Sequence, residues 1–284
     1  MGVSDANSSP SALDGASPEA RLSKRDYERL SRFIKDKTGI RTKSTMLEAR
    51  VRRRLRALGL DDFGDYCDMV MGDSGIDELV PLLDEVTTNK TDFFREANHL
   101  SYLVEHVVPR MAARGIGSMR ELRVWSAGCS SGEEPYSIAM VLAEAGCRYS
   151  ILATDICTEV LDQARQATYE VERVEPVPRH LRFKYLLLNR ARSQVRITPE
   201  LRARVHFKRL NLLEAPYDLR EHFDVIFCRN VFIYFDRATQ EGILRRFRTH
   251  LAPGGFIFLG HSESITGLDV PLVGVAPTIY QAAE

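Results

Sequence analysis

The alternation of apolar and polar residues predicts two amphipathic helices near the start of the chain. The first begins at a start signal, Ser23, and ends before Gly39, and apolar residues recur between them at helical spacing. They are Leu30, Phe33 and Ile34. The second helix is predicted over residues 44–58, where four apolar side chains fall within about 80° of one another on a helical projection. They are Leu47, Val51, Leu55 and Leu58. Shorter helices are predicted between residues 61 and 83.

From about residue 98 onward, short apolar runs alternate with helical patterns. This alternation is typical of a parallel sheet with helices on both faces. Five strands of that sheet are predicted near 123–126, 150–154, 205–209, 225–228 and 256–259. Two shorter strands, 183–187 and 194–197, predict a small β subdomain inserted at 180–205. The chain is therefore predicted to be α/β, with an all-helical domain at 22–86, a linker at 87–98 and a larger domain at 99–284.

Composition fits this arrangement. Of the 284 residues, 44% are hydrophobic and 27% are charged, which suffices for one large domain and a small one. Residues 1–21 are rich in Ser, Ala, Pro and Gly without periodicity, and this predicts a disordered tail. The formal net charge is zero, so no bulk attraction to nucleic acid or to a membrane is expected.

The cysteines and the lengths of the apolar runs indicate the cellular compartment of the protein. Five cysteines are scattered and never form C-x-x-C, which favours a reducing cytoplasm over a disulfide or zinc framework. No apolar run reaches the roughly 18 residues of a membrane span, and the N-terminus lacks the layout of a signal peptide. We therefore expect a cytoplasmic protein without direct membrane insertion.

The most informative segment is residues 125–140 (WSAGCSSGEEPYSIAM). A buried strand is followed by small residues, and Gly128 and Gly132 allow a tight turn and the close approach of a ligand. Glu133, Glu134 and Pro135 then open a helix, as first-turn residues do. The segment indicates either a nucleotide-type cofactor loop or an ordinary strand-to-helix turn.

The residues of this loop favour one kind of cofactor. There is no third glycine at the dinucleotide position, so the pyrophosphate-binding G-x-G-x-x-G pattern is absent. The two acidic residues at the helix start would repel a phosphate. S-adenosylmethionine has no phosphate and carries an ammonium and a sulfonium group, which suit this acidic helix start. Asp155, at the end of the next predicted strand, is placed to bind ribose hydroxyls or to cap the helix beginning near Thr158.

A basic stripe lies on the second predicted helix. Residues 43–58 contain six basic residues and one acid, Glu48. The stripe can be a solvated face, can follow a nucleic-acid backbone, or can meet an acidic protein helix. No aromatic residues interleave with the arginines, which disfavours single-strand binding by stacking.

Six motifs in order carry a resemblance to a known family. They are residues 87–96 (TTNKTDFFRE), the loop at 125–140, 153–156 (ATDI), 211–213 (NLL), 223–236 (FDVIFCRNVFIYFD) and 254–264 (GGFIFLGHSES). Together they resemble the CheR family, the bacterial chemotaxis receptor glutamate O-methyltransferases. The resemblance implies a Rossmann-like class I methyltransferase domain that uses S-adenosylmethionine and releases S-adenosyl-L-homocysteine. It also implies that the acceptors are glutamate carboxylates on the cytoplasmic helices of methyl-accepting chemotaxis receptors.

The resemblance assigns roles to individual residues. Arg95 and Tyr234 are expected to flank the reacting methyl group, although Arg95 can instead pair with an acid and Tyr234 can be a core residue. The expected cofactor-binding residues are Asn89, Thr91, Arg95, Gly128, Glu134, Asp155, Asn211, Leu212, Arg229 and Asn230. Asn211 is expected to meet the adenine edge, and Glu134 the cationic end of the cofactor. No metal is expected, because no second ligand-type residue is expected beside His261.

The basic stripe and the β subdomain bear on the receptor partner. Arg50, Arg53 and Arg56 are expected to dock on acidic receptor helices by charge complementarity. Family members that hold a receptor's C-terminal pentapeptide carry a glycine-containing hairpin in this subdomain, whereas residues 189–194 here (NRARSQ) contain no glycine. We therefore expect action that is independent of the pentapeptide. Separately, we expect a monomer.

Two rival functions come from other classes. A nucleic-acid methyltransferase would also combine a cofactor domain with a basic appendage, but adenine-N6 enzymes carry D/N-P-P-Y where this chain has residues 230–234 (NVFIY). A non-catalytic, cofactor-binding adaptor would not need Arg95, Asp155 and Tyr234, which this chain retains. We expect no nucleic-acid partner.

Overall fold

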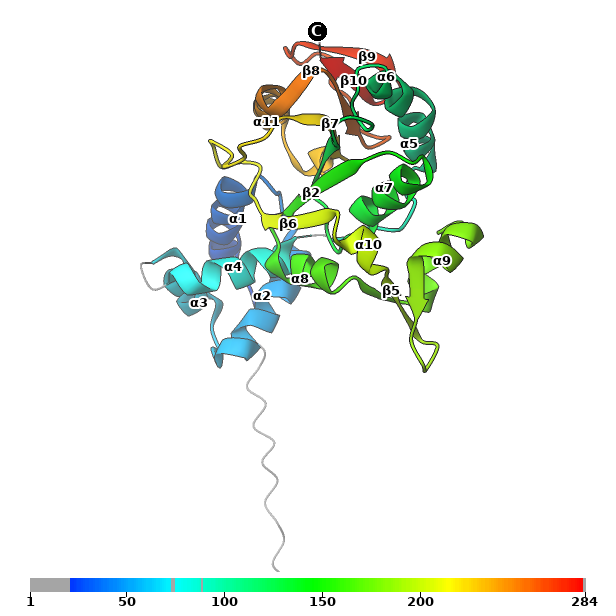
Figure 1. Cartoon of the computed structure of the whole chain (residues 1–284). Helices are drawn as coiled ribbons and strands as arrows, with labels where there is room; N and C mark the ends of the chain where they lie inside the picture. Colours follow the sequence, from blue (N-terminus) through cyan, green and yellow to red (C-terminus); the bar gives the residue numbers. More distant parts are fainter. Residues whose placement is uncertain (1–20, 73–74, 88, 283–284) are drawn as a thin grey trace, which may run out of the picture.

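The computed structural model describes residues 21–72, 75–87 and 89–282 (Figure 1). Apart from Arg21, the predicted disordered tail lies outside these residues, and so does Thr88 of the predicted linker. The N-terminal part of the described chain is helical. Its helices are α1 (Lys24–Thr38), α2 (Ser44–Leu58), α3 (Phe63–Met71) and α4 (Ile76–Val86).

Local sequence explains the first two helices. The Ser23 hydroxyl accepts a hydrogen bond from the backbone N–H of Asp26 at 3.1 Å, and Gly39 ends α1 with a φ of 72°. The second helix has the predicted bounds, and its apolar face packs into one core with residues of α1, α3 and α4. Leu58 is the exception: it is 40% exposed, because it is the last residue of α2 and the chain turns away at Gly59.

The larger part of the chain is built on a mixed sheet. Its strands are β1 (Leu122–Ala127), β2 (Tyr149–Asp155), β6 (Val205–Arg209), β7 (Phe223–Cys228), β8 (Leu251–Leu259), β9 (Leu272–Ala276) and β10 (Ile279–Ala282). The order is β6-β2-β1-β7-β8-β10-β9, with neighbours parallel up to β8 and β10 antiparallel to both β8 and β9. The five predicted strands are confirmed, and β9 and β10 are additions that the pattern does not predict.

Helices cover both faces of this sheet. They are α5 (Ala97–Tyr102), the π-helical η2 (Leu103–Val107), α6 (Val108–Ala112), α7 (Glu133–Glu144), α8 (Thr158–Gln166) and α11 (Arg237–His250). Of the remaining helices, η3 (Val171–Val174) and α9 (Arg179–Tyr185) lie beside the strands of the β subdomain, and α10 (Pro199–Arg202) and η4 (Phe232–Tyr234) are short connecting helices. Successive residues of β1 face opposite cores: Val124 packs with α5 and α7, whereas Trp125 packs with α11 (Figure 1). No helix among the described residues has the length and apolar character needed to cross a membrane.

A separate three-stranded antiparallel sheet forms the β subdomain. Its strands, in spatial order, are β3 (Thr168–Glu170), β5 (Gln194–Ile197) and β4 (Leu186–Leu188). The predicted strand at 183–187 is wrong, because α9 continues to Tyr185 before β4 begins. Leu181 and Tyr185 are buried on one side of this helix, whereas Phe183 is 77% exposed, so the burial follows a helical and not a strand period.

The turn between β4 and β5 is formed without glycine. Arg192 takes the left-handed conformation there, with a φ of 57°. The side-chain carbonyl of Asn189 accepts hydrogen bonds from the backbone N–H groups of Ser193 and Gln194, at 3.0 and 3.2 Å. These contacts stabilise the turn that a glycine would otherwise make easily.

Candidate active site

A cleft of about 280 Å³ opens at the carboxyl ends of β1, β2 and β7. All the residues that the sequence assigns to the cofactor or to catalysis line it, namely Asn89, Thr91, Arg95, Gly128, Glu134, Asp155, Asn211, Leu212, Arg229, Asn230 and Tyr234. The lining also includes Thr38, Ile40 and Phe235, which the sequence does not indicate. Nothing in their local pattern marks them, because Thr38 and Ile40 reach the cleft only when α1 packs against the larger part of the chain.

The loop after β1 requires its two glycines. Gly128 has a φ of 80°, and a Cβ there would lie 2.5 Å from Cγ2 of Val231. Gly132 has a φ of 98°, and a Cβ there would lie 2.8 Å from the Tyr169 hydroxyl. Any side chain would therefore both strain the backbone and collide with a neighbour.

Asp155 holds this loop from the end of β2. Its carboxylate accepts hydrogen bonds from the backbone N–H groups of Ser130 and Cys157, at 2.8 and 3.0 Å, and burial raises its pKa. The alternative that Asp155 caps the helix beginning at Thr158 is wrong. The N-terminus of α8 is instead capped by Asp84 of α4. The Asp84 carboxylate accepts hydrogen bonds from the backbone N–H and the hydroxyl of Thr158, at 2.9 and 2.6 Å.

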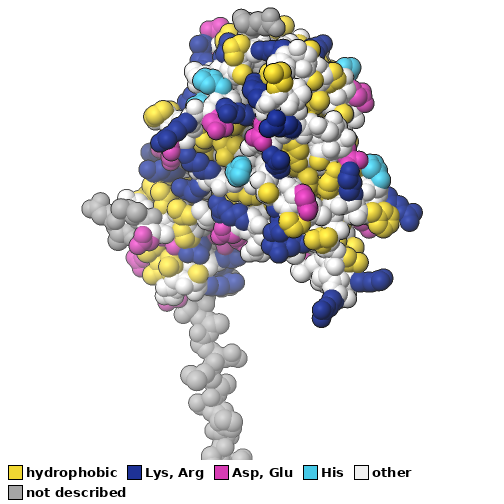
Figure 2. All heavy atoms as spheres, viewed as in Figure 1, with side chains coloured by type: hydrophobic (Ala, Val, Ile, Leu, Met, Phe, Trp, Pro, Cys, Tyr) yellow, Lys and Arg dark blue, Asp and Glu magenta, His cyan; other side chains and the backbone are white. Residues whose placement is uncertain are grey.

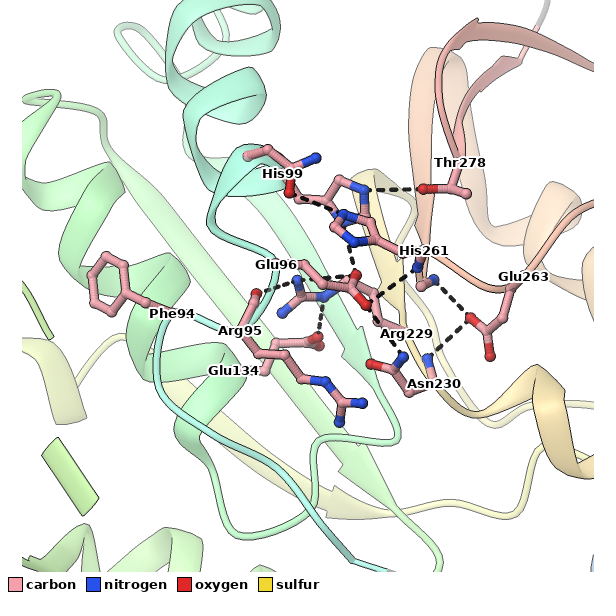
Figure 3. Close-up of polar contacts among 12 residues, drawn as sticks. Phe94, Arg95, Glu96, His99, Glu134, Arg229, Asn230, His261, Glu263 and Thr278 are labelled. Atoms are coloured by element: carbon pink, nitrogen blue, oxygen red, sulfur yellow. Dashed lines mark hydrogen bonds and ion pairs between the residues drawn. The ribbon is translucent and has the colours of Figure 1, made fainter. Parts of the chain in front are cut away.

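Behind the loop, Glu134 is paired with a buried arginine. One carboxylate oxygen accepts from the Ser126 hydroxyl at 2.6 Å, and the other accepts from Nε of Arg229 at 2.7 Å. The Arg229 side chain is only 2% exposed, and its Nη1 donates to the backbone carbonyl of Arg95 at 2.6 Å (Figure 3). Glu134 therefore lines the cleft as one half of a buried ion pair.

The two expected catalytic residues reach the cleft from different segments. Arg95 lies between Phe94 and Glu96, and its Nη1 donates to the Lys90 carbonyl at 3.0 Å. Its side chain points away from Glu96 and His99 (Figure 3). Tyr234 ends the short helix η4, which follows β7. The Arg95 guanidinium and the Tyr234 phenol therefore line the same cleft from two different segments of the chain.

Asn211 has structural contacts that the sequence does not predict. Its amide nitrogen donates to the Lys37 carbonyl at 2.8 Å and to Glu214 at 3.1 Å, and its carbonyl accepts from the Leu213 N–H at 3.0 Å. These bonds tie the end of α1 to the loop after β6. Its contact with an adenine edge stays a prediction.

The expectation that no ligand-type residue lies beside His261 is wrong. Glu96, His99 and His261 offer oxygen and nitrogen atoms that all lie within 4.8 Å of one another. However, Nη1 of Arg229 lies 3.7 Å from Oε2 of Glu96, and a divalent cation there would be repelled by this guanidinium. We therefore describe these side chains as a polar network and assign no metal to them.

Comparison with known proteins decides the family. Residues 25–87 match the family model "CheR methyltransferase, all-alpha domain", and residues 89–274 match "CheR methyltransferase, SAM binding domain". The chain belongs to the CheR methyltransferase family. It is 43% identical to a chemotaxis protein methyltransferase of Salmonella typhimurium, with 87% of this chain and 86% of the relative covered. It is 36% identical to one of Borreliella burgdorferi, with 92% and 95% covered, and 38% identical to chemotaxis protein methyltransferase 2 of Pseudomonas aeruginosa, with 97% and 99% covered.

This CheR chain is accordingly an S-adenosylmethionine-dependent methyltransferase. The cleft residues fit that cofactor: Asp155 offers a carboxylate at the end of β2, while Ile156, Leu212 and Phe235 offer apolar surface for an adenine ring. Both Glu133 and Glu134 lie in the first turn of α7, which disfavours a phosphate there. When bound, the cofactor supplies an electrophilic methyl group on its sulfonium.

Two arginines of the basic stripe on α2 pair with acids of α4. Arg50 donates to the backbone carbonyls of Glu85 and Thr87, Arg53 pairs with the Glu85 carboxylate at 2.7 Å, and Arg54 pairs with Glu78 at 2.7 Å. Acidic side chains lie among the basic ones over the N-terminal helices (Figure 2). The charge imbalance of residues 43–58 is therefore partly offset by tertiary contacts, and Arg53 and Arg56 remain exposed.

Acidification is expected to weaken the fold through His99. Burial lowers the pKa of His99 to about 4, so the imidazole is neutral in the folded protein at pH 7. The unfolded chain takes up this proton at about pH 6.5, so stability is lost as pH falls from 6.5 towards 4. We expect a contribution of about 2 kcal/mol between pH 7 and pH 5. Urea unfolding of wild type and His99→Gln at both pH values measures it, and an equal loss in both proteins would contradict it.

Proposed function

We propose that this enzyme transfers the methyl group of S-adenosylmethionine to glutamate side-chain carboxylates of methyl-accepting chemotaxis receptors. The products are glutamate methyl esters that serve sensory adaptation in the cytoplasm. One observation carries the proposal: Arg95 and Tyr234 meet the expected cofactor residues in a single cleft. The relatives named as chemotaxis protein methyltransferases support a role in chemotaxis.

The chemistry requires positioning more than acid–base catalysis. A glutamate carboxylate is ionised at neutral pH and is itself the nucleophile, so no general base is needed. Arg95 can orient the incoming carboxylate by charge, and Tyr234 can donate a hydrogen bond beside the reacting centre. Ideal in-line placement supplies up to roughly 7–11 kcal/mol of barrier lowering, and exclusion of water from the carboxylate adds to it.

The direct test is incubation with radiolabelled cofactor and purified receptor cytoplasmic domains. We expect base-labile label on the receptor, and peptide mapping should place it on glutamates. Label on DNA or RNA would favour a nucleic-acid methyltransferase. Binding of cofactor and receptor without any transfer would favour a non-catalytic adaptor.

We further propose that Arg50, Arg53 and Arg56 of α2 face the acidic receptor helices. Reversing Arg53 and Arg56 to Glu should lower kcat/KM for receptor by about tenfold or more at low salt, because attraction becomes repulsion. The salt dependence of the rate should also flatten. Steady-state methylation over a range of salt concentrations measures both effects.

The matched control reverses Arg165 and Arg204 to Glu. These arginines are about half exposed and each pairs with an acid, as Arg53 does, but they lie on α8 and beside β6. This control should retain both the rate and its salt dependence. If the two double variants behave alike, the docking proposal fails.

We also propose that the enzyme acts as a monomer and independently of a receptor's C-terminal pentapeptide. The glycine-free turn at residues 189–194 supports the independence from the pentapeptide, since its conformation is already fixed by Asn189. Calorimetry with a receptor tail peptide should show no tight binding, and removal of the tail should leave the methylation rate unchanged. Micromolar or tighter binding of that peptide would contradict this part of the proposal.

A further inference from the structure

The turn that carries Arg95 has an unusual backbone. Phe94 and Glu96, on either side of it, both have left-handed φ values, of 55° and 53°. Left-handed backbone costs residues with a side chain on the order of 1–3 kcal/mol each, so the surrounding structure must hold the turn in place. One such contact is the hydrogen bond from the Phe94 N–H to the Ser137 hydroxyl at 3.0 Å.

A second contact holds the carbonyl of Arg95 itself. The Arg229 guanidinium donates to it from Nη1, while Nε of Arg229 donates to Glu134. Arg229 follows β7 directly, so it links the turn to a rigid strand of the central sheet. The direction of the Arg95 side chain therefore depends on where the Arg229 guanidinium lies.

Glu96 fixes the other side of this guanidinium. Its Oε2 lies 3.7 Å from Nη1 of Arg229 and 3.3 Å from Nδ1 of His99. Its Oε1 accepts from the Asn230 side-chain amide and from the His261 backbone N–H, both at 3.2 Å (Figure 3). The Glu96 side chain is 10% exposed, so these contacts lie in a largely dry environment, where charge–charge attraction is strong.

We propose that Glu96 is a positioning residue for methyl transfer. Its carboxylate holds Arg229 against the Arg95 carbonyl and so directs the Arg95 guanidinium into the cleft. Glu134 and Glu96 contact the Arg229 guanidinium from two sides, and these contacts hold the turn from Phe94 to Glu96 at the edge of the cofactor site. This inference rests on the proposed function of Arg95 at the reacting centre.

The test replaces Glu96 by Gln, which keeps the shape of the side chain and removes its charge. We expect kcat for receptor methylation to fall about 10–100-fold, because a displacement of about 1 Å at a reacting group has effects of this size. The dissociation constant for S-adenosylmethionine, measured by calorimetry, should change less than about threefold, since Glu96 does not line the cleft and Arg229, which does, keeps its bond to Glu134. If Glu96 serves only the stability of the fold, Glu96→Gln should lower the unfolding temperature and leave kcat per folded enzyme unchanged.

A double-mutant cycle shows whether Glu96 acts through Arg95. In an Arg95→Ala background, Glu96→Gln should cause little further loss of kcat, because the group it positions is gone. If the two losses multiply, the inference is overturned. Glu96→Asn serves as a second variant, since asparagine takes left-handed backbone readily while its shorter side chain withdraws from Arg229.

Asp224→Asn is the matched control. Asp224 is also a buried carboxylate paired with an arginine, Arg120, at 2.6 Å, but it lies at the start of β7, away from the cleft. It should lower stability and leave kcat per folded enzyme unchanged. If Glu96→Gln gives the same result as this control, the inference fails. If wild type itself does not methylate receptor glutamates, the proposed function fails instead.

Discussion

Replacing Arg95 by alanine is expected to lower kcat for receptor methylation by about 10²–10³-fold, the range found when one transition-state donor is removed. Arg95 offers the cleft a cation that can hold the acceptor carboxylate in line with the methyl group. Its side chain donates to a backbone carbonyl, that of Lys90, so its removal leaves no buried charge unpaired. Stability should therefore change little. Single-turnover methylation with saturating cofactor measures the loss.

Two further variants sharpen this prediction. Arg95→Lys should recover part of the rate, because it keeps the charge but loses the planar, two-pronged geometry. Arg114→Ala is the control: Arg114 also donates to one backbone carbonyl, that of Pro253, but is remote from the cleft. A rate for Arg95→Ala equal to that of Arg114→Ala would remove Arg95 from the proposed mechanism.

Replacing Glu134 by alanine is expected to have the largest effect on stability. It deprives the buried Arg229 of its closest carboxylate, at 2.7 Å. Removing one partner of a buried pair costs about 3–5 kcal/mol, and here the buried guanidinium would keep only the more distant Glu96 carboxylate, at 3.7 Å. The cofactor cleft should be disturbed as well, since both residues line it. Urea unfolding and calorimetry with S-adenosylmethionine measure the two losses.

The double variant Glu134→Ala, Arg229→Met tests the reason for that loss. Without Arg229 no buried guanidinium lacks its closest carboxylate, and Glu96 keeps its hydrogen bonds from Asn230 and His261, so the double variant should be more stable than Glu134→Ala alone. Its cofactor affinity should nevertheless stay low. A double variant that is less stable than the single one would show that the stability loss does not come from the unpaired arginine.

Local sequence predicted most of the secondary structure because the relevant signals lie within a few residues of one another. The period of the apolar residues gave α2 its bounds, and Ser23 and Gly39 marked the ends of α1. The prediction failed at residues 183–187, where an apolar run contains both the end of α9 and the start of β4. Such a run fits a strand and a buried helix equally well.

The site was predicted as a set of residues but not as a set of contacts. The motifs indicated a set of residues for cofactor binding or catalysis, and the structure brings all of them together in one cleft. Their hydrogen bonds were not foreseen: Asn211 bonds Lys37, and Asp84 caps the helix beginning at Thr158. The cluster of Glu96, His99 and His261 was expected to be absent.

By itself the sequence determined where most of the helices and five strands of the central sheet form, which glycines the cofactor loop needs, and which family the motifs indicate. Only the tertiary structure decided which charges meet. Arg53 and Arg54 of α2 pair with acids of α4, and Arg229 donates to Glu134 and to the carbonyl of Arg95. The physical reason is that backbone preferences depend on near neighbours, whereas ion pairs and buried hydrogen bonds join residues that only the packed fold brings within reach.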